Sequence, residues 1–259
     1  LRRQRQMCIR DSAYTTGAQN ASFGYAALTA NTTGNYNTGL GYKALNASTT
    51  GNANTGLGYD ALRNNTTAAN NTAVGMQSME DNTTGADNTS VGHLALANNT
   101  TANNNTAVGK AALQTNTTGA NNVALGYNAL NDNTTASGNT GLGYNSLALN
   151  TTGVANVAVG NLALDANTTG DSHTAVGQNA LGANTTASNN VAIGKDAMLA
   201  NTTSSGSVAV GNYSLKSQST GYSNVAMGYE AAEELSLIHI SEPTRLLSIS
   251  DGGIWMKKK

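Results

Sequence analysis

The chain has 259 residues, of which 5% are aromatic and 10% are charged, and its formal net charge is −1. Residues 13–234 contain five basic and eleven acidic residues, a formal charge of −6, which excludes the basic stripe that nucleic-acid binding requires. The lone cysteine, Cys8, lies outside this region, so disulfides and thiolate metal sites are excluded within it.

The two ends of the chain, residues 1–12 and 235–259, differ in composition from everything between them. They contain the single Cys, Pro and Trp and eight of the thirteen Lys and Arg residues. The peptides QMCIRDS (residues 6–12) and LSLIHIS (residues 235–241) can be encoded by one DNA sequence read on opposite strands, and this inverted pair resembles a transposase-type sequencing adapter. We therefore expect that neither end is native or continues the central pattern, and that residues 13–234 are an internal part of a longer gene.

Residues 13–234 consist of thirteen copies of one 17-residue unit, marked by a glycine that recurs every 17 residues from Gly24 to Gly228. Before each glycine, with few exceptions, stand Thr or Val, then a small residue, then a large apolar one, which predicts a short strand whose side chains alternate between two faces. An Ala-Leu pair or a close relative follows three and four residues after the glycine. We expect two large apolar side chains in each unit, such as Val74 and Met79, to be buried.

The rest of the unit, Asn-Thr-Thr-Gly or Asn-Thr-Thr-Ala, is typical of turns. A repeat of helix pairs is excluded, because it needs units of about 30 residues or more and strong helix formers. The predicted fold is therefore all-β: a parallel β-solenoid of thirteen 17-residue coils, stacked at about 4.8 Å per coil into a rod of roughly 60 Å. We expect the Asn and Thr columns to hydrogen-bond along the axis.

The predicted core is thin, because two large apolar side chains per coil offset the ordering entropy of 17 residues. Association with another chain that buries additional apolar surface would add to the stability of the solenoid. The sequence therefore favours a homotrimer over a solitary solenoid.

Three segments of the repeat carry a resemblance to a known family: NVAIGKDAM (residues 190–198), NTAVGKAAL (105–113) and NVALGYNAL (122–130). They resemble the head repeats of YadA-like trimeric autotransporter adhesins, and similar repeats occur in bacteriophage tail fibres. The resemblance implies a left-handed β-roll with its strand packed inward, three associated chains and an extracellular location. The adhesin unit is shorter and lacks the Asn-Thr-Thr turn. The regular NTAVG…AL…NTTG pattern favours a fibre of the phage or environmental-bacterial kind.

The repeat offers no convergence of unlike catalytic groups, so we expect no enzyme, no cofactor and no metal site. His93 and His173 lie about five coils apart, on the order of 24 Å, and cannot share a site. We interpret both as tolerated substitutions on the surface or in turns. The recurring TGLGY segments lack the helix that a dinucleotide-binding loop must begin.

The candidate binding surface is a column of tyrosines after the glycine: Tyr25, Tyr42, Tyr59, Tyr127 and Tyr144. Such a column could bind the sugar rings of a cell-surface glycan or a host receptor, or it could only pack between coils. The glycines themselves are predicted to be structural residues at strand ends, among them Gly75, Gly92, Gly109, Gly126, Gly160 and Gly177.

The Asn-Thr-Thr turn also spells a glycosylation sequon in ten coils, including Asn31, Asn82 and Asn167, although turn and ladder chemistry explains the same residues. Adjacent threonines such as Thr83 and Thr84 should diverge, whereas an ice-binding face needs both hydroxyl columns on one side. We therefore predict a structural or adhesive fibre segment of a phage tail fibre or bacterial adhesin, without nucleic-acid or membrane contact. The alternative is an ice-binding or carbohydrate-binding solenoid that uses its Thr, Asn and Tyr columns.

Overall fold

The computed structural model describes residues 16–233, and this part of the chain is a single stack of short strands. The thirteen strands have three residues each: β1 (Ala21–Phe23), β2 (Thr38–Leu40), β3 (Thr55–Leu57), β4 (Thr72–Val74), β5 (Thr89–Val91), β6 (Thr106–Val108), β7 (Val123–Leu125), β8 (Thr140–Leu142), β9 (Val157–Val159), β10 (Thr174–Val176), β11 (Val191–Ile193), β12 (Val208–Val210) and β13 (Val225–Met227).

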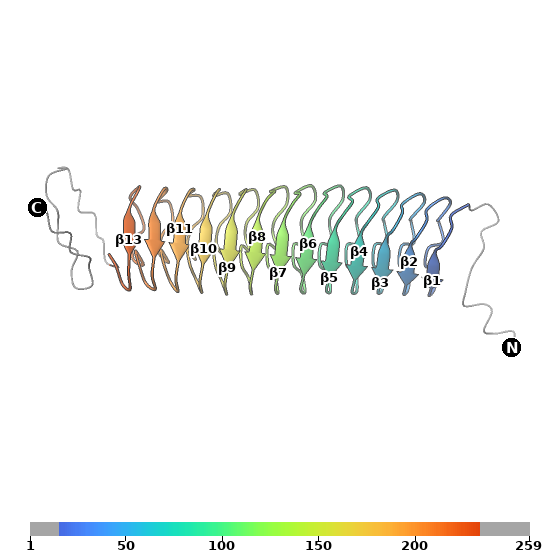
Figure 1. The fold of residues 1–259 in the computed structure, drawn as a ribbon, viewed down its shortest axis with the longest axis horizontal. Helices are drawn as coiled ribbons and strands as arrows, with labels where there is room; N and C mark the ends of the chain where they lie inside the picture. Colours follow the sequence, from blue (N-terminus) through green and yellow to red (C-terminus); the bar gives the residue numbers. More distant parts are fainter. Residues whose placement is uncertain (1–15, 234–259) are drawn as a thin grey trace, which may run out of the picture.

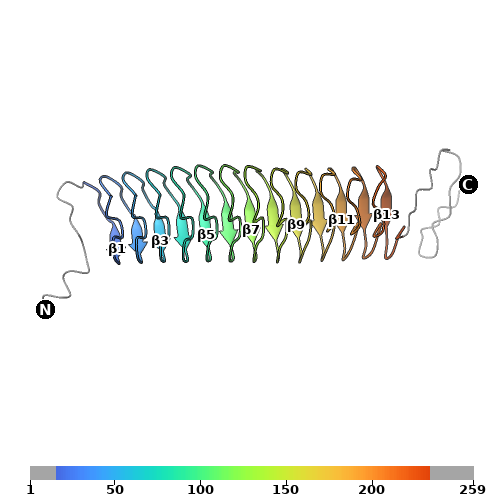
Figure 2. The ribbon, with the colours of Figure 1, turned by 180° about the vertical axis from the view of Figure 1, so that it is seen from behind.

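The strands form one parallel sheet in chain order, with β1 at one end of the rod and β13 at the other (Figures 1 and 2). The register advances by one 17-residue unit per strand, so that Thr72 pairs with Thr89 and Val74 with Val91. The prediction of an all-β parallel solenoid is confirmed. The expectation that residues 1–12 and 235–259 leave the repeat concerns segments outside the described residues.

Backbone hydrogen bonds join neighbouring coils at the turns as well as at the strands. The N–H of Gly75 donates to Leu57 O (2.8 Å), that of Met79 to Ala95 O (3.0 Å) and that of Thr83 to Thr100 O (2.9 Å). Neighbouring coils are therefore bonded to each other at the strands and at several positions around the rest of the coil.

The strands pack with the opposite face inward from the one expected. The small middle residue is fully buried, as at Ala124, whereas the large residue before the glycine points outward, with Leu125 49% exposed and Leu40 46% exposed. The expectation that this large residue is buried was wrong. The reason is crowding: a Cβ added at Gly141, in the middle of β8, would lie 3.3 Å from Cγ of Leu130, so only Gly, Ala or Ser fits there.

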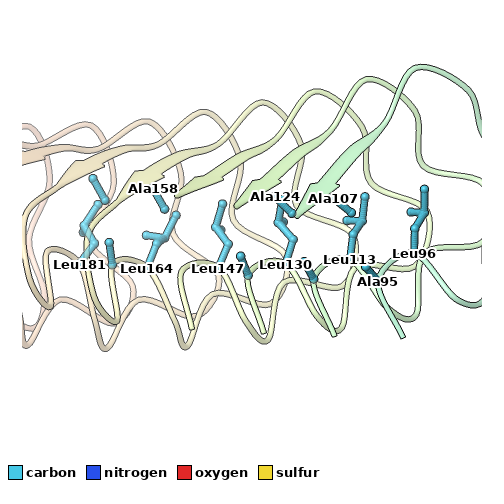
Figure 3. Close-up of a cluster of buried hydrophobic side chains, with 14 of the residues drawn as sticks. Ala95, Leu96, Ala107, Leu113, Ala124, Leu130, Leu147, Ala158, Leu164 and Leu181 are labelled. Carbon is cyan, nitrogen blue, oxygen red and sulfur yellow. The ribbon is translucent and has the colours of Figure 1, made fainter. Parts of the chain in front are cut away.

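The second apolar anchor is confirmed. Its residues, here called the Leu column, form a buried row beneath the strands, part of which is shown in Figure 3. The Leu column consists of Leu28, Leu45, Leu62, Met79, Leu96, Leu113, Leu130, Leu147, Leu164, Leu181, Met198 and Leu215. Each has a positive φ, such as 53° at Leu130. Branching at Cβ is strongly disfavoured at positive φ, which explains why the column holds Leu and Met but neither Val nor Ile.

The other half of the interior is polar and is filled by two columns of buried asparagines. The Asn37 column consists of Asn37, Asn54, Asn71, Asn88, Asn105, Asn122, Asn139, Asn156, His173 and Asn190. The Asn65 column consists of Asn65, Asn82, Asn99, Asn116, Asn133, Asn150, Asn167, Asn184 and Asn201.

The asparagine side chains bond along the axis and across the coil. In the Asn37 column, the N–H of Asn105 donates to Oδ1 of Asn88 (2.9 Å). In the Asn65 column, Nδ2 of Asn99 donates to Oδ1 of Asn82 (2.7 Å). Nδ2 of Asn88 and Nδ2 of Asn99 also meet at one carbonyl, that of Ala102 (2.8 and 3.1 Å). The predicted asparagine ladders are confirmed.

Candidate functional site

The glycine at the end of each strand has a conformation and a location that exclude a side chain. Gly126 has a φ of 138°, and a Cβ built on it would lie 2.3 Å from the carbonyl oxygen of Gly143 in the next coil. The same geometry recurs at Gly75, Gly92, Gly109, Gly160 and Gly177. These glycines allow the backbones of neighbouring coils to approach closely.

The tyrosine column is divided into two stacks. The rings of Tyr25 and Tyr42 lie 5.2 Å apart at 14°, and those of Tyr42 and Tyr59 lie 5.0 Å apart at 7°. Tyr127 and Tyr144 form a separate stack, with centroids 5.4 Å apart at 10°. Met76, His93 and Lys110 occupy the three coils between the stacks.

Stacking along the axis covers the ring faces that a sugar would use. Both faces of Tyr42 lie against neighbouring rings, and Nζ of Lys43 lies 5.2 Å from its centroid. In the second stack, Nζ of Lys110 lies over the ring of Tyr127, 5.7 Å from its centroid. The geometry therefore accounts for the tyrosines as cross-coil pairs and does not provide a continuous platform for sugar rings.

The sequon asparagines lie in the interior. Asn82 and Asn167 are fully buried, and Nδ2 of Asn82 donates both to Asn65 Oδ1 (2.7 Å) and to Gly85 O (2.9 Å). A glycan has no access to these atoms in the folded coil. The Asn-Thr-Thr sequence is thus explained by the turn and by the asparagine ladder.

The two threonines of the turn diverge, as predicted. The hydroxyl of Thr83 donates to Thr100 O (2.9 Å), which places it in an axial ladder, whereas Thr84 is exposed. The exposed column that contains Thr84 is Thr in every coil and comprises Thr16, Thr33, Thr50, Thr67, Thr84, Thr101, Thr118, Thr135, Thr152, Thr169, Thr186, Thr203 and Thr220. One outward column is available on this edge, not two.

The interpretation of His173 as a surface or turn substitution was wrong. Its side chain is buried, with 1% exposure, and it occupies a place in the Asn37 column. Its Nε2 contacts Ala187 O (2.5 Å) and its Nδ1 accepts the N–H of Asn190 (3.2 Å). Burial lowers the pKa of His173, against smaller opposite effects of these two hydrogen bonds and the charge of Asp171. His93 is half-buried and lies in the tyrosine column.

The strands also present a surface that was not predicted from the sequence. It is formed by the first and third residues of the thirteen strands and is here called the strand face. Thr or Val fills the first position in all strands but β1, and Phe, Leu, Val, Ile or Met fills the third. Charged residues are absent from these positions in all thirteen strands. The range of sizes at the third position was the available signal, because a crowded interior column would not accept both Val and Phe.

Comparisons with protein-family models, with curated proteins and with solved structures find no match to this chain. Between residues 16 and 233, no His, Cys, Asp and Glu side chains gather in a group of three or more that could hold a metal ion. That same span contains no helix of the length and apolar character needed to cross a membrane.

Proposed function

We propose that residues 13–234 are a stiff rod segment of an extracellular fibre, either a phage tail fibre or a bacterial surface adhesin, which spaces or presents host-binding or surface-binding regions. The observation that supports this proposal is the unbroken register of the sheet, in which all thirteen strands pair in chain order. With steps of about 4.8 Å, these strands extend for roughly 60 Å.

The chemistry of the coils supports a mechanical role. Each column repeats one kind of side chain along the axis, whereas catalysis needs unlike groups at one place. The buried asparagine ladders and the backbone bonds around the perimeter give every coil the same directional contacts with its neighbours, which resists bending. The proposal thus needs neither a cofactor nor a catalytic residue.

Self-association into a homotrimer through the strand face is part of this proposal, as is a left-handed coil. The face is uncharged and continuous, and its width of about 7 Å over about 60 Å gives an area on the order of 400 Å². A mainly apolar patch of that size is comparable to the largest patch on a typical monomer, and such patches are often functional. Ile193, 39% exposed, and Leu125, 49% exposed, are the kind of side chain that a second copy would cover.

Light scattering on the purified full chain tests the trimer, for which we expect three times the chain mass. The double variant Val108→Glu/Leu125→Glu places two charges on the strand face and should yield monomers. The matched control Thr118→Glu/Thr135→Glu places the same charges on the exposed turn of adjacent coils and should stay trimeric. A monomeric wild-type chain would remove the trimer but not the rod, whereas a compact particle in small-angle scattering would remove both.

The exposed threonine column favours a second candidate, a binder of a periodic surface such as ice. Because the thirteen strands stack in one register, the turns between them repeat the same hydroxyl and methyl group at equal steps along the rod. Binding to a crystal face requires groups that match the lattice in two directions, whereas this edge supplies a single column of threonines. The fibre therefore remains the preferred function. Thermal hysteresis of the purified protein would support the second candidate, and its absence at high concentration would eliminate it.

A further inference from the structure

His173 occupies a position that asparagine fills in the neighbouring coils. There, the asparagine side chain performs two tasks: Oδ1 accepts the N–H of the same column in the next coil, and Nδ2 donates to a carbonyl. For Asn139 these bonds are to the N–H of Asn156 (2.9 Å) and to Gly153 O (2.9 Å).

The imidazole ring of His173 performs both tasks in one protonation state. Nδ1 accepts the N–H of Asn190 (3.2 Å), as Oδ1 would, and Nε2–H donates to Ala187 O (2.5 Å), as Nδ2 would. This substitution works only when the ring is neutral and carries its proton on Nε2. A second proton on Nδ1 would point at the N–H of Asn190, and two donors would then face each other.

The surroundings offer little compensation for a charged ring. The side chains packed against it from the adjoining coils, Asn156, Asn184, Ala187 and Asn190, are uncharged. Asp171 is the charged group that acts on the ring, and its Oδ1 accepts the N–H of Val154 (2.7 Å). A protonated His173 would thus be a buried cation without a counterion in direct contact.

The Asn65 column is also at its weakest beside His173. Nδ2 of Asn184 lies 3.4 Å from Ala187 O, whereas the equivalent bond from Asn133 to Ala136 O is 3.0 Å. The same Nδ2 lies 3.1 Å from Nε2 of His173, and because Nε2 carries the proton of the neutral ring, two donors meet there. Oδ1 of Asn184 is buried without a hydrogen-bond partner. The next residue of the column, Asn201, donates to Ser204 O (3.0 Å), so the chain of amide bonds that begins at Asn65 ends at Asn184.

We propose that the coil containing His173, between β9 and β11, is an acid-sensitive opening point of the rod. Protonation of Nδ1 breaks the bond to the N–H of Asn190 and separates this coil from the next, while coils whose Asn37 column holds asparagine stay closed. This acid-sensitive opening depends only on contacts within and between coils. It therefore goes beyond the proposed fibre function and does not depend on it.

The direction of the pH effect follows from the lowered pKa of His173. The open state binds a proton near the ordinary histidine pKa of about 6.5, whereas the closed state binds it only at lower pH. Closure is therefore most stable above that pH and weakens as the pH falls below it. Because one proton is involved, the opening constant should rise about tenfold per pH unit until the closed-state pKa is reached.

Hydrogen exchange of the full chain between pH 7.5 and 5.0, corrected for intrinsic rates, tests the proposal. Backbone amides of residues 187–193 should lose protection about tenfold per pH unit below about pH 6.5, while those of β4 to β6 keep theirs. His173→Asn should abolish this dependence. Asn105→His should create a second sensitive point between β5 and β7.

A further variant tests the effect of the Asp171 charge on the ring. Asp171→Asn keeps an acceptor for the N–H of Val154 but removes the charge that raises the pKa of His173, so the closed state should resist protonation to a lower pH. Protection of residues 187–193 that is independent of pH in the wild type would overturn the proposal. Equal acid sensitivity in His173→Asn would overturn it as well.

Discussion

The two halves of the interior are equally buried but are held by different forces. Beneath the strands lies the Leu column, in which burial of apolar surface is non-directional. Beneath the turns lie the two asparagine columns, in which most side chains form directional hydrogen bonds along the axis and across the coil. In the apolar half, the residue types that fit are therefore limited by side-chain volume and backbone conformation. In the polar half, they are limited by the positions of hydrogen-bond donors and acceptors.

The exceptions within each column follow this difference. Met79 and Met198 replace Leu with another unbranched apolar side chain. In the polar half the replacements include Ser48, His173 and Ser207, which differ in size but all offer a hydrogen-bonding group. Exchanging a residue type between the halves should therefore cost more than a change within one half.

The largest effect is expected for Leu130→Asn, which places an amide in the apolar half. It loses the burial of a leucine and leaves polar atoms without partners, so the coil should be destabilised by about 4 kcal/mol or more. Hydrogen exchange of β7 to β9 and urea unfolding measure this. Leu130→Met is the control, with an expected cost below about 1.5 kcal/mol. Equal costs for the two variants would refute the proposed difference.

Leu130→Ile tests the backbone requirement of the Leu column at constant volume. The φ of Leu130 is 53°, where a β-branched residue is strained, so we expect a loss of about 2 kcal/mol in excess of Leu130→Met. Val108→Ile, an outward position on β6, should change the free energy of unfolding by less than about 0.5 kcal/mol. If both isoleucines were tolerated equally in urea unfolding, positive φ would not explain the absence of branched residues.

Asn133→Ala tests the directional half. It removes donors to Asn116 Oδ1 (2.8 Å) and Ala136 O (3.0 Å) and the acceptor for Asn150 Nδ2. The buried groups left behind should cost about 1–3 kcal/mol, measurable as faster exchange in the three adjoining coils. The exposed Asn98 supplies the matched control, because Asn98→Ala should be nearly neutral. A neutral Asn133→Ala would mean that the ladder adds no stability.

The smallest effect concerns the surface. Tyr42→Ala removes two stacked contacts and should cost on the order of 1 kcal/mol. Tyr36→Ala, at a 64% exposed tyrosine on the turn edge, should cost less than half as much. Thermal unfolding distinguishes them, and a larger loss from Tyr36→Ala would show that stacking is not what holds the tyrosine column.

The number of coils, their register and the axial ladders were predictable, because identical units in one period can stack in only one way. The inward face of the strand was not predicted correctly. Alternation of large and small side chains over three residues indicates that the strand has two faces, but it does not show which face is buried. The burial of His173 was also missed. That ring replaces an asparagine by matching the positions of its two polar atoms, and such a match becomes visible only once Ala187 and Asn190 are placed around it.

The bonds between residues 17 positions apart have a consequence for how such a gene changes length. Removing residues 106–122 would join Asn105 to Val123 and leave every remaining residue in its own column. Losing a single residue would shift all later side chains of that coil out of their columns. Recombination between copies of the unit therefore yields shorter or longer rods that still fold, in steps of about 4.8 Å. The length of the rod can thus evolve without new types of contact between coils.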